Sequence, residues 1–219
     1  MSKTKKKKNR GPRKAPGNRP GIMERSDIPY AQRMALKHQH EIKASRDHAA
    51  KIAMYCNSIS MYEVKGIGYK RLIRFAQHFK EVLDEFYEDP EVGMAHAKRR
   101  LEQMGMEISG EWYTVKMDGL TVKEQEIHDH SMQAVQIALI CSAIAMNDVF
   151  GFGKESQYLI AKRAEELTEE YNQKGEKFLL DKMEKIGFVI LDGEVIAFAD
   201  DDGNAITHKQ WREQNNVEM

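Results

Sequence analysis

The chain has 219 residues, of which 41% are hydrophobic, enough for one compact domain or two small ones. No apolar run approaches the roughly 18 residues that a membrane-spanning helix needs, and the N-terminus lacks the apolar stretch of a secretory signal. These features exclude the membrane and secreted classes, and we expect a cytoplasmic protein. Its two cysteines, Cys56 and Cys141, fit that compartment and are expected to be buried packing residues.

The overall charge of zero hides a strong asymmetry. Residues 1–20 hold nine Lys or Arg and no acid, which leaves 25 basic against 34 acidic residues, a net charge of −9, in the rest of the chain. The segment has no large apolar residue after Met1 to bury, so residues 1–23 are predicted to be a disordered basic arm.

Such an arm gains affinity for nucleic acid by releasing counterions. A basic arm can also be a solubilising tail, be attracted to an acidic partner, or contact the acidic remainder of its own chain, and these alternatives stay open. The candidate nucleic-acid-binding residues of the arm are Lys5, Lys6, Lys7, Lys8, Arg10, Arg13 and Lys14.

The first predicted unit covers residues 24–120. A long helix is expected to begin at Ser26 or Asp27 and to end at Gly66, which fits a left-handed C-terminal cap. Two further helices follow, at 69–87 and about 91–104. The stretch "WYTVKMDGLTV" then predicts a β-hairpin around Asp118-Gly119.

The second predicted unit covers residues 121–206. A capping box, Thr121 with Glu124, should start its long helix, and Gly151 should end it. The next elements are helices at 154–173 and 175–186, a hairpin in "FVILDGEVIAF" around Asp192-Gly193, and a second capping box, Thr207 with Gln210, that opens a short terminal helix within 207–219.

These two units repeat each other. Residues 49–68 and 134–153 are identical at nine of twenty positions at a constant offset of 85, where chance gives about one. We therefore predict a mainly α fold with two small β-hairpins (α+β), built as a tandem duplication with pseudo-two-fold symmetry. A single-unit ancestor would have been a symmetric dimer, and this hypothesis requires the two Cys-bearing helices to touch.

Each unit carries a Gly-x-Gly turn, "VKGIGYKR" and "VFGFGKES". The turn resembles that of the helix–hairpin–helix family, whose second helix begins with backbone amides that bind a phosphate; the resemblance covers about a dozen residues. Leu72 and Gln157 stand where that family has a small residue, and the preceding helix is longer. The alternative is a glycine-linked helical hairpin that only reverses the chain.

Charge separates the two turns. Residues 61–80 have a net charge of +4, and residues 146–165 have none, so phosphate binding is expected at the first turn only. A solvated helix face is the alternative, and Lys98, Arg99 and Arg100 would extend a real basic patch. The candidate residues of the first turn are Lys65, Gly66, Gly68, Lys70, Arg71 and Arg74.

No enzyme signature is found, and we expect no catalytic residue, metal or cofactor. The repeated acids Glu63 and Asp148 lie near helix C-termini, where the helix dipole disfavours a carboxylate. Their presence in both units indicates a structural ion pair or a capping role. A catalytic use of either acid is the third and weakest hypothesis.

The segment "ALICSAIAMNDVFGFGKES" is similar to uncharacterised accessory proteins of phages and prophages of Gram-positive bacteria. The resemblance covers about half of the chain and implies a bacterial cytoplasm. The sequence thus predicts a non-enzymatic accessory protein that binds DNA or RNA through its arm and first turn. The alternative is a protein-interaction module, such as an inhibitor of a host system, acting through the acidic body. A homo-oligomer is left open.

Overall fold

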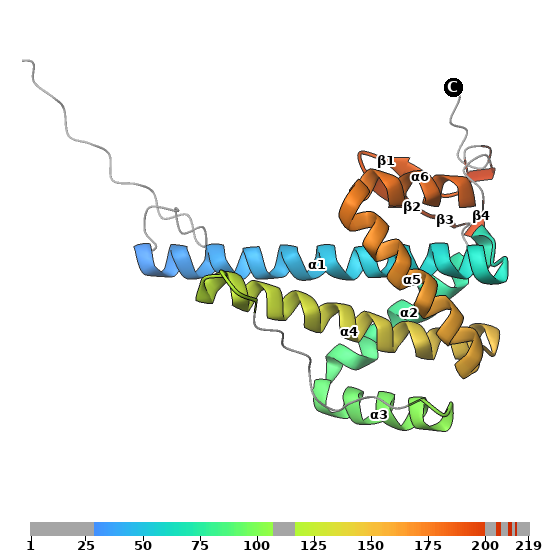
Figure 1. The fold of residues 1–219 in the computed structure, drawn as a ribbon, viewed down its shortest axis with the longest axis horizontal. Helices are drawn as coiled ribbons and strands as arrows, with labels where there is room; N and C mark the ends of the chain where they lie inside the picture. Colours follow the sequence, from blue (N-terminus) through green and yellow to red (C-terminus); the bar gives the residue numbers. More distant parts are fainter. Residues whose placement is uncertain (1–28, 107–116, 200–204, 207–209, 212, 214–219) are drawn as a thin grey trace, which may run out of the picture. The chain divides into compact units, whose positions relative to one another are not determined.

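Six helices make up most of the computed structural model, which describes residues 29–106, 117–199, 205–206, 210–211 and 213 (Figure 1). The chain divides into two units, one up to Gln39 and one from His40 onward, which we consider separately. The elements are α1 (Tyr30–Lys65), α2 (Tyr69–Glu88), α3 (Pro90–Gln103), α4 (Val122–Phe150), α5 (Lys154–Lys174), α6 (Glu176–Ile186), β1 (Val189–Leu191), β2 (Glu194–Ile196), β3 (Phe198–Ala199) and β4 (Ala205–Ile206). The mainly helical class is confirmed.

Among the described residues the first helical one is Tyr30, and the carbonyl of Pro29 accepts the amide of Arg33 at 3.1 Å. The predicted start of this helix at Ser26 or Asp27 lies outside the described residues.

Both Gly-x-Gly turns end their helices in the predicted way. Gly66 and Gly151 have φ of +65° and +67°. In each turn the glycine amide donates a hydrogen bond to the carbonyl four residues before it, and the next amide donates to the carbonyl six residues before it. At the second turn Gly151 donates to Asn147 at 2.7 Å and Phe152 to Met146 at 3.4 Å. These two hydrogen bonds satisfy backbone carbonyls that the last helical turn would leave without a partner.

Two helix starts are defined by side-chain caps. Asp89 accepts the amides of Glu91 and Val92 at the start of α3, and a proline follows it at the first helical position. At α4 the predicted capping box of Thr121 and Glu124 is present in both directions. Local sequence thus determines both starts.

The predicted second hairpin is confirmed: β1 pairs with β2 in antiparallel register around Asp192-Gly193. Both turn residues have positive φ, 52° and 79°, as the tight hairpin turn requires. The predicted first hairpin is wrong in its second half: Asp118-Gly119 forms a turn, but no strand follows it, because the capping box at Thr121 starts α4 at Val122. Residues 107–116 lie outside the described residues. Strands β3 and β4 form a further antiparallel pair.

The two Cys-bearing helices, α1 and α4, are in contact, as the hypothesis of a symmetric ancestor requires. The hydroxyls of Ser45 and Ser131 lie 2.7 Å apart, and Asn57 Nδ2 donates to Ser142 Oγ at 3.3 Å. Because both pairings advance in the same direction, this part of α1 runs parallel to α4, as Figure 1 shows. Cys56 and Cys141 are buried beside this contact, which confirms their predicted role.

The helices after each turn pack on the long helix of the other half, where the first half is residues 24–120 and the second is 121–206. Helices α2 and α3 pack against α4. In turn, Thr168 of α5 donates to Cys56 Sγ of α1, and Lys51 of α1 pairs with Glu176 of α6 at 2.9 Å. The buried hydrophobic residues of both halves form one cluster.

Helix α4 is long and apolar enough to cross a membrane by length and composition. This finding corrects the expectation that no apolar run approaches that length. Half of the apolar window is buried inside the protein, where its buried residues include Cys141 and Ile144. A buried core helix has the same composition as a membrane span, and the contacts of α4 with α1 and α2 are of that kind.

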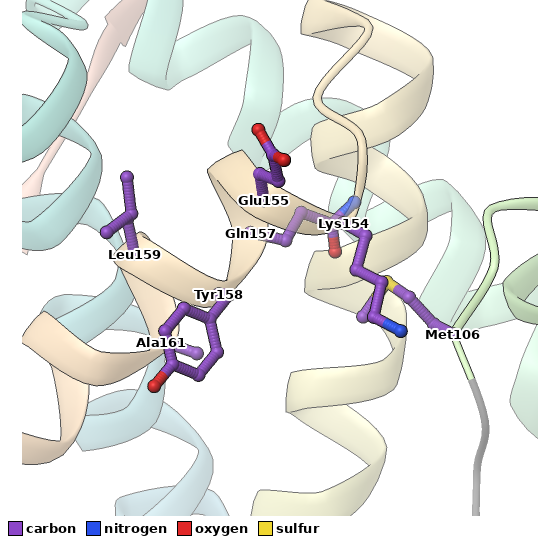
Figure 2. Close-up of a pocket in the computed structure, with 7 residues that line it drawn as sticks. All are labelled: Met106, Lys154, Glu155, Gln157, Tyr158, Leu159 and Ala161. Atoms are coloured by element: carbon purple, nitrogen blue, oxygen red, sulfur yellow. The ribbon is translucent and has the colours of Figure 1, made fainter.

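One face of α5 borders an open cavity of about 810 Å³ (Figure 2). Its lining residues are Met106, which follows α3, and six residues of the first two turns of α5: Lys154, Glu155, Gln157, Tyr158, Leu159 and Ala161. Tyr158 and Leu159 are exposed, so part of the apolar surface of α5 faces solvent there.

Candidate functional site

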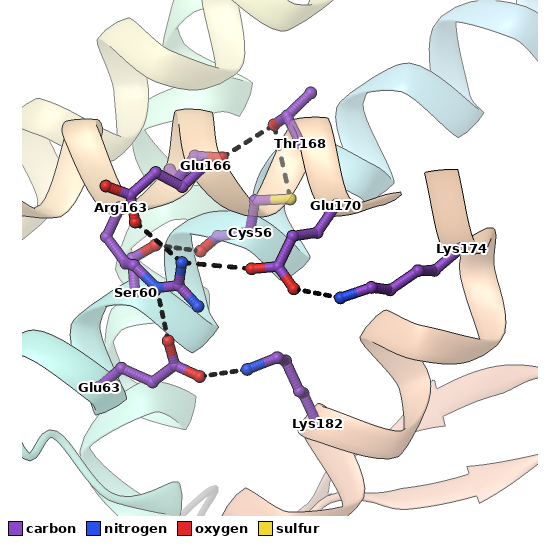
Figure 3. Close-up of polar contacts among 10 residues, drawn as sticks. Cys56, Ser60, Glu63, Arg163, Glu166, Thr168, Glu170, Lys174 and Lys182 are labelled. Atoms are coloured by element: carbon purple, nitrogen blue, oxygen red, sulfur yellow. Dashed lines mark hydrogen bonds and ion pairs between the residues drawn. The ribbon is translucent and has the colours of Figure 1, made fainter. Parts of the chain in front are cut away.

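Glu63, in the last turn of α1, is held by two cations from the second half (Figure 3). Arg163 Nε of α5 donates to its carboxylate at 2.7 Å, and Lys182 Nζ of α6 donates to the other oxygen. Arg163 also reaches Glu166 at 2.9 Å. The acid therefore joins three helices at one end of the long helix pair.

Asp148, in the last turn of α4, is held in the same way by the first half. His78 Nε2 of α2 lies 2.8 Å from its carboxylate, and Arg100 of α3 donates to the same oxygen. The second ring nitrogen of His78 lies 2.8 Å from Glu81. Each acid thus bridges the two helices that follow the turn in the opposite half.

The two clusters match position by position. Glu63 and Asp148 are 85 residues apart, as are His78 and Arg163, and Arg100 and Lys182 are 82 apart. The offset falls by three because the first half has three extra residues before its third helix. The predicted structural ion pair is confirmed for both acids. The matching offset is the signal in the sequence that points to these cations, but only the structure shows which acid each one binds.

The surroundings shift the pKa values of both acids and of His78. Partial burial acts to raise the pKa of Glu63, but the hydrogen bonds from Lys182 and Arg163 outweigh it, so the pKa lies below its usual range. Asp148 has a lowered pKa for the same reasons, through Arg100 and His78. The hydrogen bond to Asp148 raises the pKa of His78. All three groups are therefore stabilised in their charged forms.

The predicted basic residues of the first turn lie together at the surface. Lys65 is the last residue of α1, and Lys70, Arg71 and Arg74 lie exposed on the first two turns of α2. Within the described residues, none of the four forms an ion pair with a carboxylate. They differ in this from Arg100, Arg163 and Lys182, which are bound to the two acids.

Two of these cations are held by aromatic rings of the second turn. Lys65 Nζ lies 5.8 Å from the ring centre of Phe152, and the Arg71 guanidinium lies 5.1 Å from that of Phe150. The two rings are themselves 5.2 Å apart. Cation–π contact fixes a guanidinium while leaving its in-plane N–H donors free for another partner. The sequence did not suggest this role for Phe150 and Phe152.

Gly68 is the N-cap of α2, and no described side chain caps that helix start. Its φ is −77° and its ψ is 173°, an extended backbone that other residues also adopt. The positive end of the helix dipole therefore points out beside Lys70 and Arg71 without a neutralising side chain from the described residues. Gly153 has the same conformation and the same lack of a side-chain cap at α5.

Of the basic residues of α3, Arg100 is bound to Asp148. Lys98 and Arg99 are exposed on α3 next to it. The arm residues Lys5 to Lys8, Arg10, Arg13 and Lys14 lie outside the described residues, as do the rest of residues 1–28.

The part of the chain that the structure describes offers no metal-binding geometry. Among its residues, no group of three or more His, Cys, Asp and Glu side chains is arranged to hold a metal ion. The acids that the sequence singled out, Glu63 and Asp148, are both bound to cations. Their carboxylates therefore form interhelical ion pairs, which join α1 to α5 and α6 and α4 to α2 and α3.

Comparison with known proteins adds no family to this description. No family model matches the chain, and no curated protein and no solved structure is significantly similar to it.

Proposed function

We propose that the protein is a non-enzymatic accessory protein that binds nucleic acid through its basic arm and its first Gly-x-Gly turn. The observation that carries this proposal is the sorting of cations around the two turns. Those of the clusters are bound to Glu63 or Asp148, whereas Lys65, Lys70, Arg71 and Arg74 gather at the first turn without a carboxylate partner among the described residues.

The local geometry favours phosphate as the ligand of this turn. Arg71 is exposed and lies over the ring of Phe150, and a planar guanidinium binds phosphate through two parallel hydrogen bonds. The start of α2, where no described side chain forms a cap, adds a favourable dipole for an anion. The resemblance to phage and prophage accessory proteins is the reason to place this activity in a bacterial cytoplasm.

A salt titration tests the proposal. Binding to short duplex DNA, single-stranded DNA and RNA is measured for the full chain, for a chain starting at Gly21, and for the Lys70→Glu/Arg71→Glu double variant. The logarithm of affinity should fall linearly with the logarithm of salt concentration. Loss of two phosphate contacts should make that slope shallower by about 2 in the double variant.

Gly68→Asp separates binding from folding. An aspartate at the N-cap stabilises a helix, and a Cβ at Gly68 meets no atom within 4 Å, so the fold should persist. Its negative charge should nevertheless repel a phosphate. Gly153→Asp makes the same change at the second turn and serves as the control, which should keep wild-type affinity. Equal losses in the two variants, or no loss in either, would exclude the first turn as the binding site.

The same titration addresses the alternative function, a protein-interaction module. Two results would show that the folded body has no nucleic-acid role. One is that the full chain does not bind nucleic acid; the other is that the chain starting at Gly21 loses all binding while both first-turn variants keep wild-type affinity. The acidic body, with its net charge of −9, would then be the surface to present to basic protein partners.

We also propose that the chain arose by tandem duplication of a unit of about 85 residues. The support comes from the nine identities in residues 49–68 and 134–153 and from the matched clusters of Glu63 and Asp148. A chain of 24–120 alone should form a symmetric dimer, with its own second helix against the long helix of the other copy. A stable folded monomer of that chain, seen by light scattering, would contradict this origin.

A further inference from the structure

The cavity on α5 contains a buried acceptor that the described residues do not satisfy. Gln157 is 3% exposed, and its Nε2 donates to the carbonyls of Phe152 at 2.8 Å and Ala143 at 3.0 Å. These two bonds use both amide hydrogens and fix which end of the side chain carries the oxygen. Gln157 Oε1 is buried and has no hydrogen-bond partner in the part of the chain that the structure describes. A buried acceptor without a hydrogen bond is unusual in a folded protein, and it favours a donor supplied by a bound ligand.

The cavity wall around Gln157 is mainly apolar. Figure 2 shows Met106 and Tyr158 on opposite sides, with Lys154 and Gln157 between them. Tyr158 is 67% exposed and Leu159 48%, so both present apolar surface to solvent. A mostly apolar site with one polar anchor is the usual pattern of a small-molecule pocket.

The matching face of α2 shows what such a surface accepts. Tyr69, at the position that matches Lys154, packs its ring edge-on against Phe188 at 4.9 Å and donates its hydroxyl to the carbonyl of Ile206 at 3.1 Å. Phe188 occupies the position that matches Met106, and both amides make the same bond back into the preceding helix. On α2 the ring of Phe188 and the backbone of Ile206 therefore cover the face that is open on α5.

We propose that the α5 cavity binds an aromatic group carrying one N–H donor, of the indole class. The ring lies between Met106 and Tyr158, and its N–H donates to Gln157 Oε1. Because that oxygen has almost no exposed surface, the donor reaches it by displacing the exposed side chain of Lys154 at the rim. The ring can belong to a free small molecule or to a tryptophan side chain of a peptide.

Titration of the full chain with three probes tests this site, using isothermal calorimetry or ligand-observed NMR. Indole should bind, and benzothiophene, which has the same shape but no N–H, should bind about tenfold or more weakly because it leaves the acceptor unpaired. N-acetyl-tryptophanamide, the third probe, distinguishes the two sources of the ring. Tighter binding of this probe than of indole assigns the site to a peptide, and the reverse order to a free molecule.

Variants locate the binding. Tyr158→Ala lies on an exposed position, should fold normally, and should weaken indole binding about tenfold, whereas Tyr62→Ala, on an exposed position of α1 outside the cavity, should have no effect. Gln157→Met should abolish the preference for indole over benzothiophene. The proposal is overturned if wild type does not bind indole at millimolar concentration, if it binds both ring systems equally, or if Tyr158→Ala changes nothing. Trp112, in the segment 107–116 outside the described residues, carries an indole ring of its own. Indole binding seen only in a Trp112→Ala variant would also overturn the proposal, by assigning the cavity to that ring of the chain.

Discussion

His78 and Arg163 occupy matching positions in the two acid–cation clusters, but only His78 changes its charge near neutral pH. Asp148 and Glu81 are the acids that contact its ring, and both act to raise its pKa. The cluster of Glu63 has no such titration, because an arginine stays protonated. The two clusters, both at the C-terminal end of the long helix pair, therefore respond differently to pH.

We expect the cluster of Asp148 to weaken as pH rises. Because the folded-state pKa of His78 is raised, its stabilisation is fully present below the unfolded value near 6.5 and is lost as pH rises through the folded value. Relative to His78→Arg, wild type should lose about 0.5–1 kcal/mol of unfolding free energy, since the ring is partly exposed. Urea unfolding between about pH 5.5 and 8.5 measures this.

The control for this prediction is His96→Gln, which alters an exposed histidine of α3 and should keep the wild-type dependence on pH. Parallel curves for wild type and His78→Arg would show that the ring contributes no titrating stabilisation.

The cysteines are expected to be inert in the folded protein. Burial raises the pKa of Cys141 to about 12 and also raises that of Cys56. Because the thiolate is the reactive form, alkylation by iodoacetamide at about pH 8 should be slow until the protein unfolds, and then both thiols should react. Mass spectrometry across a urea series should show labelling that follows the unfolding curve. Rapid labelling of either thiol without denaturant would mean that the α1–α4 contact opens locally.

At the scale of the elements, the two glycines of each turn differ in backbone conformation. Gly66 and Gly151 adopt left-handed backbone that a side chain disfavours, whereas Gly68 and Gly153 are extended. None of the four would place a Cβ within 4 Å of another described atom, so the difference between them is one of backbone conformation alone. The first glycine of the repeated pattern is required by the turn, and the second is not.

Alanine substitutions in the second turn should show this difference. Gly151→Ala should lower the free energy of unfolding by about 1–2 kcal/mol, the cost of left-handed backbone in a residue with a side chain. Gly153→Ala should change it by less than about 0.5 kcal/mol. Chemical denaturation of both variants gives the comparison. Equal effects would mean that the second glycine has a constraint besides its conformation.

At the scale of the whole molecule, the part from His40 onward has one shared core. Helices α2 and α3 pack on α4, and α5 and α6 contact α1 through Thr168, Arg163 and Lys182. Neither half therefore buries its second and third helices on its own long helix alone. The two halves of the chain are therefore interlocked in this core.

A chain cut at the exposed Asp118-Gly119 turn should reassemble. Fragments 1–118 and 119–219 should form a one-to-one complex when expressed together, because each supplies the long helix on which the helices of the other pack. Each fragment expressed alone should be less helical or self-associated. Light scattering and circular dichroism measure both states. Two fragments that fold separately as monomers and ignore each other would contradict the interlocked core.

Much of the local structure follows from the sequence by itself. The glycine caps at Gly66 and Gly151, the capping box at Thr121 and the Asp192-Gly193 hairpin all rest on hydrogen bonds or backbone preferences within a few residues. For that reason the predicted helix ends that fall on described residues agree with the structure to within a residue or two. The repeat also led correctly to the contact between the two Cys-bearing helices.

Only the tertiary structure decided which distant residues meet. The partners of Asp148 and Glu63 lie 70 and 119 residues away in the chain, so helix packing, and no local rule, selects His78 and Lys182. Packing likewise places Phe150 and Phe152 under Arg71 and Lys65, and leaves Gln157 Oε1 without a donor among the described residues. Secondary structure is specified locally, whereas the grouping of charges and the open face of α5 depend on how the two halves interlock.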